Sequence, residues 1–227
     1  MNQNFIKTFL QKIVPIVIAV LCIGIPSYAD NYWTFSGFFV SPQDMEVTSS
    51  KGITNEAITG SGSEIDMNSE PGLALAVGIE YESGFRVGLE YAYRSMDMEK
   101  AVSDTLDANL RGDVTINSWL VNFGYNFNTF SELTPYVGLG LGLAFNEGSL
   151  LKIAGVNTGF ADKKNTGFAY QIFLGSYYQF TEGVEVGLGY RFFDAGEPDF
   201  DFLKGGVGTH NFELSFRYNH PFLELDF

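Results

Sequence analysis

Cysteine, histidine and basic residues are scarce in this 227-residue chain, and no long apolar run occurs after its first 30 residues. Cys22 is the only cysteine, and His210 and His220 are the only histidines. The chain beyond Cys22 therefore has no disulfide, no thiol catalysis and no cysteine-based metal site. Lysine and arginine number 13 against 27 acidic residues. This balance argues against a nucleic-acid ligand, because phosphates need basic patches.

The first 29 residues are expected to form a cleaved signal peptide. Lys7 and Lys12 precede an apolar run at 13–25, and Ser27-Tyr28-Ala29 follows as a small-x-small cleavage site. The run is too short for a comfortable membrane-spanning helix. All 27 acidic residues lie beyond Ala29. The expected mature domain, residues 30–227, is therefore strongly acidic and free of cysteine.

Many segments of the chain alternate apolar side chains with small or polar ones. The segment FRVGLEYAYR (85–94) has large apolar or aromatic residues at every odd position. A strand points successive side chains to opposite faces, so one face here is apolar and the other carries charge. Eight such segments are predicted, at residues 32–41, 73–82, 85–95, 114–127, 136–146, 168–180, 184–193 and 211–222.

The connections between these segments alternate between short turns and long polar stretches. Short turns follow the second, fourth and sixth segments, and long stretches at 42–70, 96–113, 147–167 and 194–210 follow the others. This layout predicts an all-β fold: an eight-stranded antiparallel up-and-down transmembrane β-barrel with short periplasmic turns and long extracellular loops. A soluble secreted β protein is the alternative.

Charged residues occupy the face that would point into the barrel. An unpaired buried charge costs several kcal/mol, so glutamates and arginines are expected to pair across strands, with Arg191–Glu213 and Glu185–Arg217 as natural partners. The network could be a static polar plug or a gate that opens a narrow water path. Its members are Glu80, Arg86, Glu90, Arg94, Glu185, Arg191, Glu213 and Arg217.

No cofactor or metal is expected. The GLGLG segment (138–142) lacks the third glycine and the following helix of a dinucleotide motif, and its small residues would make room for arginine and tyrosine inside the barrel. Asp199-Phe200-Asp201 lacks the pattern of a calcium loop. Three of the four expected loops are strongly acidic, which suits a solvated rim or basic partner surfaces.

Three segments carry a family resemblance: TPYVGLG (134–140), VGLGYRFFD (186–194) and HNFELSFRY (210–218). The mature chain resembles the small bacterial outer-membrane β-barrel superfamily, which includes the membrane domain of outer-membrane protein A, opacity-type proteins and surface antigens of obligate intracellular bacteria. The resemblance implies an outer-membrane location, contact with membrane lipid and lipopolysaccharide, and insertion by the barrel-assembly machinery. Phe222 and Phe227 are both candidates for the terminal aromatic residue that this machinery reads.

The resemblance favours a non-enzymatic surface antigen or adhesin whose loops meet the environment or host surface molecules. A narrow cation-preferring channel gated by the interior charges is the second hypothesis. A lipid-A-modifying enzyme is the third. A deacylase of this size would use a His-x-Ser pair. The residues two positions after His210 and His220 are Phe212 and Phe222, which argues against this chemistry.

Overall fold

The computed structural model describes residues 29–220, except 51, 54, 60, 61, 105, 128, 130 and 202. The expected signal peptide therefore lies outside the described residues, apart from Ala29 at its end. The terminal choice between Phe222 and Phe227 also lies outside them. No helix in the described part is long and apolar enough to cross a membrane.

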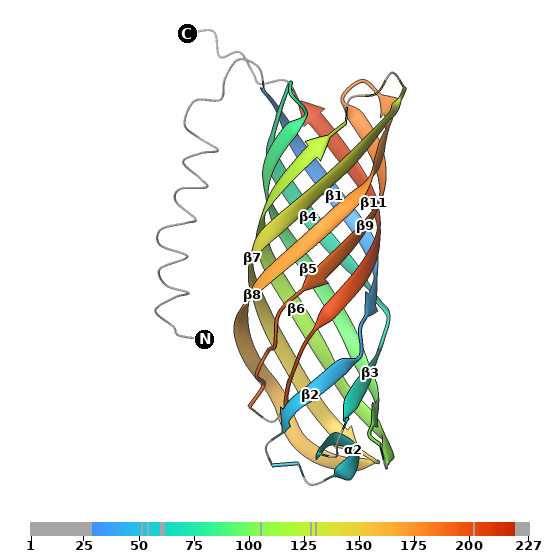
Figure 1. Ribbon diagram of the computed structural model, residues 1–227, viewed down its shortest axis with the longest axis vertical. Coiled ribbons are helices and arrows are strands. Elements are labelled where there is room, and N and C mark those ends of the chain that lie inside the picture. Colours follow the sequence, from blue (N-terminus) through green and yellow to red (C-terminus); the bar gives the residue numbers. More distant parts are fainter. Residues whose placement is uncertain are drawn as a thin grey trace.

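Eight long antiparallel strands form a closed ring (Figure 1). The ring is closed because β1 pairs with β11, and β5 pairs with both β4 and β6. The eight-stranded barrel is thus confirmed. The strands are β1 (Ala29–Pro42), β4 (Glu70–Tyr81), β5 (Phe85–Val102), β6 (Asp107–Asn126), β7 (Leu133–Ile153), β8 (Val156–Thr181), β9 (Val184–Asp194) and β11 (Gly208–His220).

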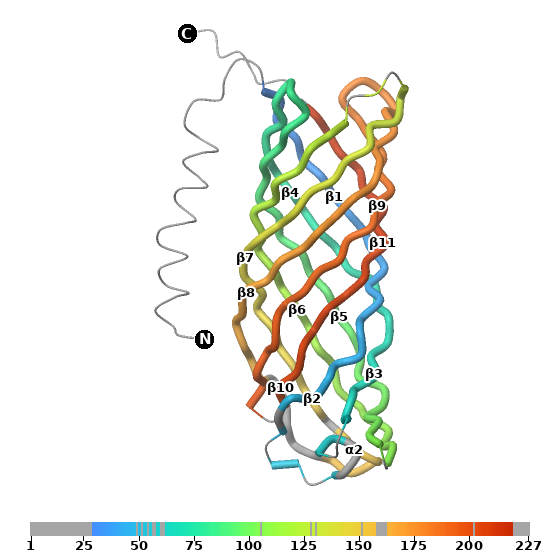
Figure 2. Tube along the Cα trace, viewed as in Figure 1, coloured from blue at the N-terminus to red at the C-terminus, as the bar shows by residue number. Residues whose placement is uncertain are grey.

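The two ends of the barrel differ. One end, called here the turn end, holds the short connections 82–84, 127–132 and 182–183, and Asn31 pairs with His220 beside them. The other end carries a folded cap of β2 (Met45–Ser50), α2 (Glu56–Thr59), β3 (Glu64–Asn68) and β10 (Leu203–Gly205). Figure 2 shows these cap elements together at the end of the barrel away from the turns.

The expectation of long loops is wrong at two of the four connections. β5 and β6 continue through residues 96–113 to a turn at 103–106, and β7 and β8 continue through 147–167 to the two-residue turn Ala154-Gly155. Both turn residues have positive φ, 48° and 82°, as a tight hairpin requires. The connections at 42–70 and 194–210 contain the cap elements. Two of the expected loops are therefore ordered sheet, and the other two are long connections that contain short elements.

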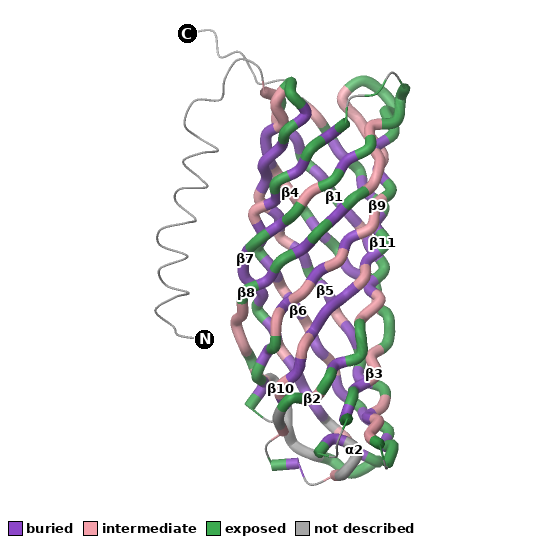
Figure 3. Tube along the Cα trace, viewed as in Figure 1, coloured by how far each residue is buried: buried purple, intermediate pink, exposed green. Residues whose placement is uncertain are grey.

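An apolar belt covers the outer surface toward the turn end. On β5 its outer face spans residues 85–93, close to the roughly 9–11 residues that a transmembrane strand needs. Buried and exposed residues alternate along the strands (Figure 3). Exposed members of the belt include Trp33, Phe35, Leu75, Trp119, Phe123, Leu139, Leu141, Ile172, Leu174, Leu188, Phe212 and Phe216.

The belt ends at the same level on four neighbouring strands. Tyr93, Asn117 and Phe145 are register partners at its edge. One step further, the outer row consists of polar residues, Ser95, Thr115, Glu147 and Lys164. Residues 95–102, 107–116, 147–153 and 156–165 lie beyond the belt and are called the extension. Charges on a lipid-facing strand surface are costly near the membrane midplane, so this row marks the limit of the lipid-facing surface.

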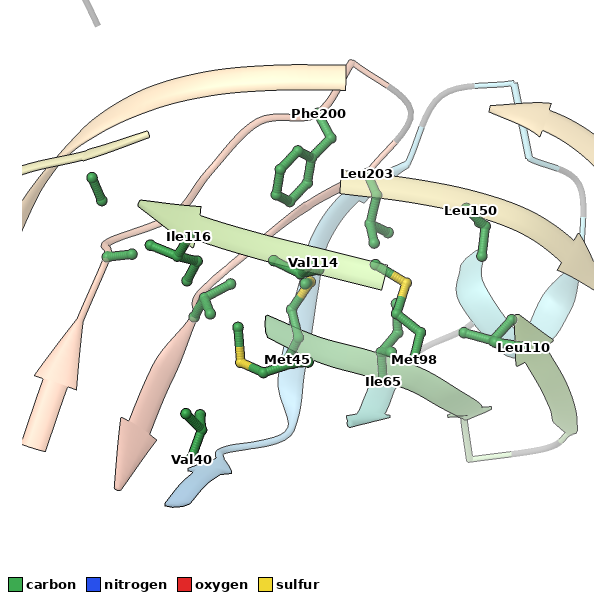
Figure 4. Close-up of a cluster of buried hydrophobic side chains, with 14 of the residues drawn as sticks. Val40, Met45, Ile65, Met98, Leu110, Val114, Ile116, Leu150, Phe200 and Leu203 are labelled. Carbon is green, nitrogen blue, oxygen red and sulfur yellow. The ribbon is translucent and has the colours of Figure 1, made fainter. Parts of the chain in front are cut away.

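The interior changes character at the same level. Met96, Met98, Val114 and Ile116 point inward in the extension and are at most 3% exposed. They join residues of the cap in one apolar cluster (Figure 4). The expectation of a polar interior therefore holds only inside the belt. The extension is built like a soluble protein, with water outside and apolar side chains inside, because the hydrophobic effect there favours an inward apolar face.

Candidate functional site: the interior charge network

Arg191 of β9 lies between two carboxylates inside the belt. Its Nη1 is 2.5 Å from Oε1 of Glu90 on β5, and its Nη2 is 2.6 Å from Oε2 of Glu213 on β11. All three side chains are at most 6% exposed. This triad links strands on different sides of the barrel, and it contains the expected Arg191–Glu213 pair.

Neutral polar side chains complete the hydrogen bonding of this triad. Asn122 donates to Glu90 at 2.8 Å, and Ser36 donates to Glu213 at 2.7 Å. Gln171 accepts from Arg191 at 2.9 Å and donates to Glu90 at 3.2 Å. Buried charges are tolerated when their remaining lone pairs and protons are satisfied in this way.

A second triad lies nearer the turn end. Arg217 of β11 contacts Glu80 of β4, and its Nη1 is 3.4 Å from Glu185 of β9, the other expected pair. Asn126 donates to Glu80 at 2.7 Å, and Asn219 donates to Glu185 at 3.0 Å. Each triad holds two carboxylates and one guanidinium, so each has one excess negative charge.

Arg86 and Arg94 have no carboxylate within ion-pair distance in the described part of the chain, contrary to the expected pairing. Arg86 donates to the Tyr177 hydroxyl at 3.1 Å and lies 4.7 Å from the Tyr136 ring centre. Arg94 lies 3.8 Å from the Phe193 ring centre and donates to Ser118 at 3.1 Å. Guanidinium groups stack well on aromatic faces, which offsets part of the cost of burial.

Arg217, Arg86 and Arg191 form a stack with aromatic rings through the belt. The Tyr177 ring lies 5.1 Å from Arg217 and 5.4 Å from Arg86. The Phe173 ring lies 5.7 Å from Arg86 and 5.5 Å from Arg191. Seven of the eight residues proposed from the sequence are thus joined, whereas Arg94 contacts Phe193 and Ser118. The positive charges of Arg86 and Arg94 offset the excess negative charges of the two triads, so the eight residues are neutral overall.

Glycines make room for these large side chains. A Cβ on Gly124 would lie 2.5 Å from Nε of Arg86, and one on Gly138 would lie 2.3 Å from the Phe173 ring. A cavity of about 30 Å³ remains between Arg86 and the Arg191 triad, room for about one or two waters. Toward the cap, Arg94 and the apolar cluster follow. The arrangement therefore fills and braces the barrel.

The sequence argues against a His-x-Ser pair at either histidine. The structure bears on this only at His210, because His220 is the last residue that the structure describes. His210 lies beside Tyr190, with 2.5 Å between Nδ1 and the phenol oxygen, and its Nε2 is 3.3 Å from Gln43. Neither contact is with a serine. In the described residues, no group of three or more His, Cys, Asp or Glu side chains is arranged to hold a metal ion.

Sequence reasoning missed the apolar core of the extension, although the sequence contains its signal. In β5 the apolar positions are odd up to Tyr93 and even from Met96, and in β6 they are even up to Ile116 and odd from Trp119. This change of phase marks the level at which the surroundings change from lipid to water.

These features define an integral outer-membrane β-barrel, and comparison with known proteins gives the family. Residues 16–219 match the family described as outer membrane protein beta-barrel domain, and the chain belongs to this family. It is accordingly a protein of the bacterial outer membrane. The signal peptide expected from the sequence stays a prediction.

Three known proteins show the range of similarity. The outer membrane protein PagN of Salmonella typhimurium is 28% identical over 145 residues, which is 63% of this chain and 59% of PagN. Two crystal structures share the fold. Neisserial surface protein A has a TM-score of 0.51 at 19% identity, covering 84% of this chain and 97% of its own. OprG of Pseudomonas aeruginosa has a TM-score of 0.56 at 15% identity, covering 85% and 97%.

Proposed function

We propose that this protein is a non-enzymatic surface protein whose extension and cap project from the outer leaflet and contact the environment or a host cell, as an adhesin or surface antigen would. The observation that carries the proposal is the coincidence of two changes at one level: the outer face turns polar where the inner face turns apolar. An apolar core with a polar exterior is a water-facing design. In this orientation the turn end faces the periplasm.

The chemistry of the projecting surface supports contact with basic partners. Asp97, Glu99 and Asp107 are exposed on β5 and β6, and Glu64 is exposed on the neighbouring β3. A surface dominated by one sign of charge steers partners of the opposite sign and disfavours like-charged ones. The partner class proposed here is therefore a basic protein surface of the host.

Attachment of bacteria to cultured animal cells tests this function. The chain would be produced in a non-adherent Gram-negative strain, alone and with Asp97→Asn, Glu99→Gln and Asp107→Asn combined. We expect the wild type to confer attachment and the neutralised variant to reduce it severalfold, while both remain folded by heat-modifiability in gel electrophoresis. Glu82→Gln with Glu182→Gln at the turn end is the matched control and should attach like the wild type.

Two results would contradict the proposal: no gain of attachment with the folded wild type, or attachment that is insensitive to the charges of the extension. The channel hypothesis has weaker support, because the stacked arginines fill the belt and the apolar cluster follows them toward the cap. A lipid-modifying enzyme has weaker support still, because the hydrogen-bond partners of His210 are Tyr190 and Gln43 and not the serine that a His-x-Ser chemistry needs.

A further inference from the structure

The second triad lies at the mouth of the barrel at the turn end, where its carboxylates remain partly exposed. The side chains of Glu80 and Glu185 are 22% and 14% exposed, whereas that of Arg217 between them is 1% exposed. Two carboxylates against one guanidinium leave one excess negative charge. Asp30 of β1, the register partner of Glu80, is exposed beside them and adds another carboxylate. The mouth is therefore negatively charged, and its carboxylates can be reached from solution.

Arg86 does not cancel this charge at the mouth, although it is the register partner of Glu80 on β5. Its guanidinium donates to the Tyr177 hydroxyl at 3.1 Å and lies 4.7 Å from the Tyr136 ring centre. Arg86 also lines the small cavity that borders the Arg191 triad. It therefore lies further inside the barrel, and the excess negative charge stays near the mouth.

Two buried amide oxygens beside these carboxylates have no hydrogen-bond donor in the described part of the chain. Asn126 is 2% exposed; its Nδ2 donates to Glu80 at 2.7 Å, and its Oδ1 is without a partner. Asn219 is arranged alike, with Nδ2 donating to Glu185 at 3.0 Å and Oδ1 without a partner. The oxygen and nitrogen of one amide are about 2.3 Å apart, so each oxygen lies within about 5 Å of a carboxylate. Buried acceptors of this kind are rare and indicate a bound water or ion.

We propose that the mouth binds a calcium ion, and that its ligands are the carboxylates of Glu80 and Glu185 and the amide oxygens of Asn126 and Asn219. Ca²⁺ takes about six to eight oxygen ligands from carboxylates, amide carbonyls and water, in flexible geometry. Each carboxylate offers about four lone-pair positions and contacts one asparagine and Arg217, so both keep lone pairs for a cation. Mg²⁺ fits less well, because it demands a near-ideal octahedron.

Charge favours a cation over water alone at this site. Both amide groups without a partner are acceptors, and water could satisfy them, but water would leave the excess negative charge as it is. Nε of Arg217 is also without a partner, but it is a donor on the side chain that already contacts both carboxylates. The proposed ion adds to Arg217 and does not replace it.

A bound ion would join strands from different sides of the barrel. The four proposed ligands come from β4, β6, β9 and β11, and β6 and β4 are not neighbours of the other two in the sheet. A ligand that binds the folded state alone stabilises it. The site lies at the opposite end of the molecule from the extension, so this proposal goes beyond the surface function and does not depend on it.

Terbium luminescence of the full refolded chain in detergent micelles tests the site. Tb³⁺ replaces Ca²⁺ at oxygen-ligand sites, and nearby tyrosines sensitise its emission. The ring centres of Tyr32 and Tyr177 lie 4.5 and 5.1 Å from the guanidinium of Arg217. We expect saturable tyrosine-excited emission that Ca²⁺ displaces, with a Ca²⁺ dissociation constant on the order of 10⁻⁴–10⁻³ M, as in weak extracellular sites.

Glu185→Gln removes one ligand charge and keeps the contact of Arg217 with Glu80. We expect it to weaken Ca²⁺ binding about tenfold, because the affinity of such sites depends on the number of ligand charges. Glu82→Gln with Glu182→Gln is the matched control, since it removes exposed carboxylates from the neighbouring turns. The control should keep its Ca²⁺ affinity within about twofold.

Asn126→Asp separates a ligand from a merely structural hydrogen bond. The variant exchanges a neutral ligand for a charged one, so we expect Ca²⁺ to bind about tenfold more tightly. A structural asparagine predicts a less stable barrel and no gain of affinity. Absence of saturable emission would overturn the proposal, as would unchanged Ca²⁺ affinity in the folded Glu185→Gln and Asn126→Asp variants. An equally large loss in the control variant would also overturn it, because diffuse attraction to an acidic surface would then explain the binding.

Discussion

The guanidinium of Arg191 holds Glu90 and Glu213 together, with nitrogen–oxygen distances of 2.5 and 2.6 Å inside the barrel. The three residues come from β9, β5 and β11, so one side chain connects strands that are not all neighbours in the sheet. With Gln171, Asn122 and Ser36 completing the hydrogen bonds, the cluster fixes how the walls of the barrel pack against one another.

Removal of Arg191 should destabilise the barrel strongly. Arg191→Met leaves two buried carboxylates without a counter-charge, and breaking a buried pair in this way costs about 3–5 kcal/mol. The measurement is the free energy of unfolding from urea titrations in micelles. Lys164→Met, which breaks an exposed pair, is the control and should cost no more than about 1 kcal/mol.

A compensated variant separates charge from packing. Arg191→Met combined with Glu90→Gln and Glu213→Gln removes all three charges together, so we expect it to recover most of the lost stability. If the triple variant were as unstable as Arg191→Met alone, the charge argument would be wrong and packing would be the dominant contribution.

Substitutions at two adjacent positions of β6 should differ strongly in their effect on the free energy of unfolding. Ile116 is fully buried, whereas Thr115 faces outward. Ile116→Asn should lower the free energy of unfolding by about 3 kcal/mol, because apolar burial is lost and an amide is buried. Thr115→Asn should change it by less than about 0.5 kcal/mol. Equal effects of the two substitutions would contradict the inward apolar core.

The sequence predicts the barrel well because lipid imposes a simple rule. Outward residues in the belt must be apolar, so strands such as 85–94 show a clear two-residue period. The Arg217–Glu185 contact also follows from the sequence, because these two residues are register partners in adjacent strands. Register partners in adjacent strands can be found by counting residues from the turn that joins the strands.

Contacts across the barrel cannot be predicted by counting residues. The contact of Arg191 with Glu90 and the stacking of Arg94 on Phe193 depend on the tilt and shear of the closed sheet, which alternation does not encode. The extension was missed for another reason. Strand segments were expected to end at residues 95 and 146, just after the last outward apolar residues Tyr93 and Phe145, although the strands continue with their apolar face inward.

The filled interior should make the protein electrically silent. Refolded protein in a planar bilayer is expected to show no steady conductance steps, because the cavity beside Arg86 in the belt has a volume of only about 30 Å³ and the apolar cluster follows it toward the cap. Steady cation-selective steps that change with Arg191→Met or Glu213→Gln would restore the channel hypothesis.

The stability of the cap should increase as the pH falls, through protonation of Asp66 of β3. Burial, followed by the neighbouring carboxylate of Asp44, raises the pKa of Asp66 above its ordinary value. The folded cap thus binds this proton more readily than the unfolded chain, and its stability increases as the pH falls through that raised pKa. Resistance of the cap to proteolysis should increase in the wild type as the pH falls through the raised pKa of Asp66, and depend less on pH in Asp66→Asn.

The most direct test of the account is to measure which parts of the chain face the outside of the cell. Single cysteines at Asp97, Glu99, Ser83 and Glu182 would be introduced with Cys22→Ser, since Cys22 is the only native cysteine. Intact cells would then be treated with a bulky maleimide that does not cross the outer membrane. The account predicts labelling at 97 and 99 in intact cells, and at 83 and 182 only after permeabilisation. Labelling at 83 and 182 alone in intact cells would contradict it.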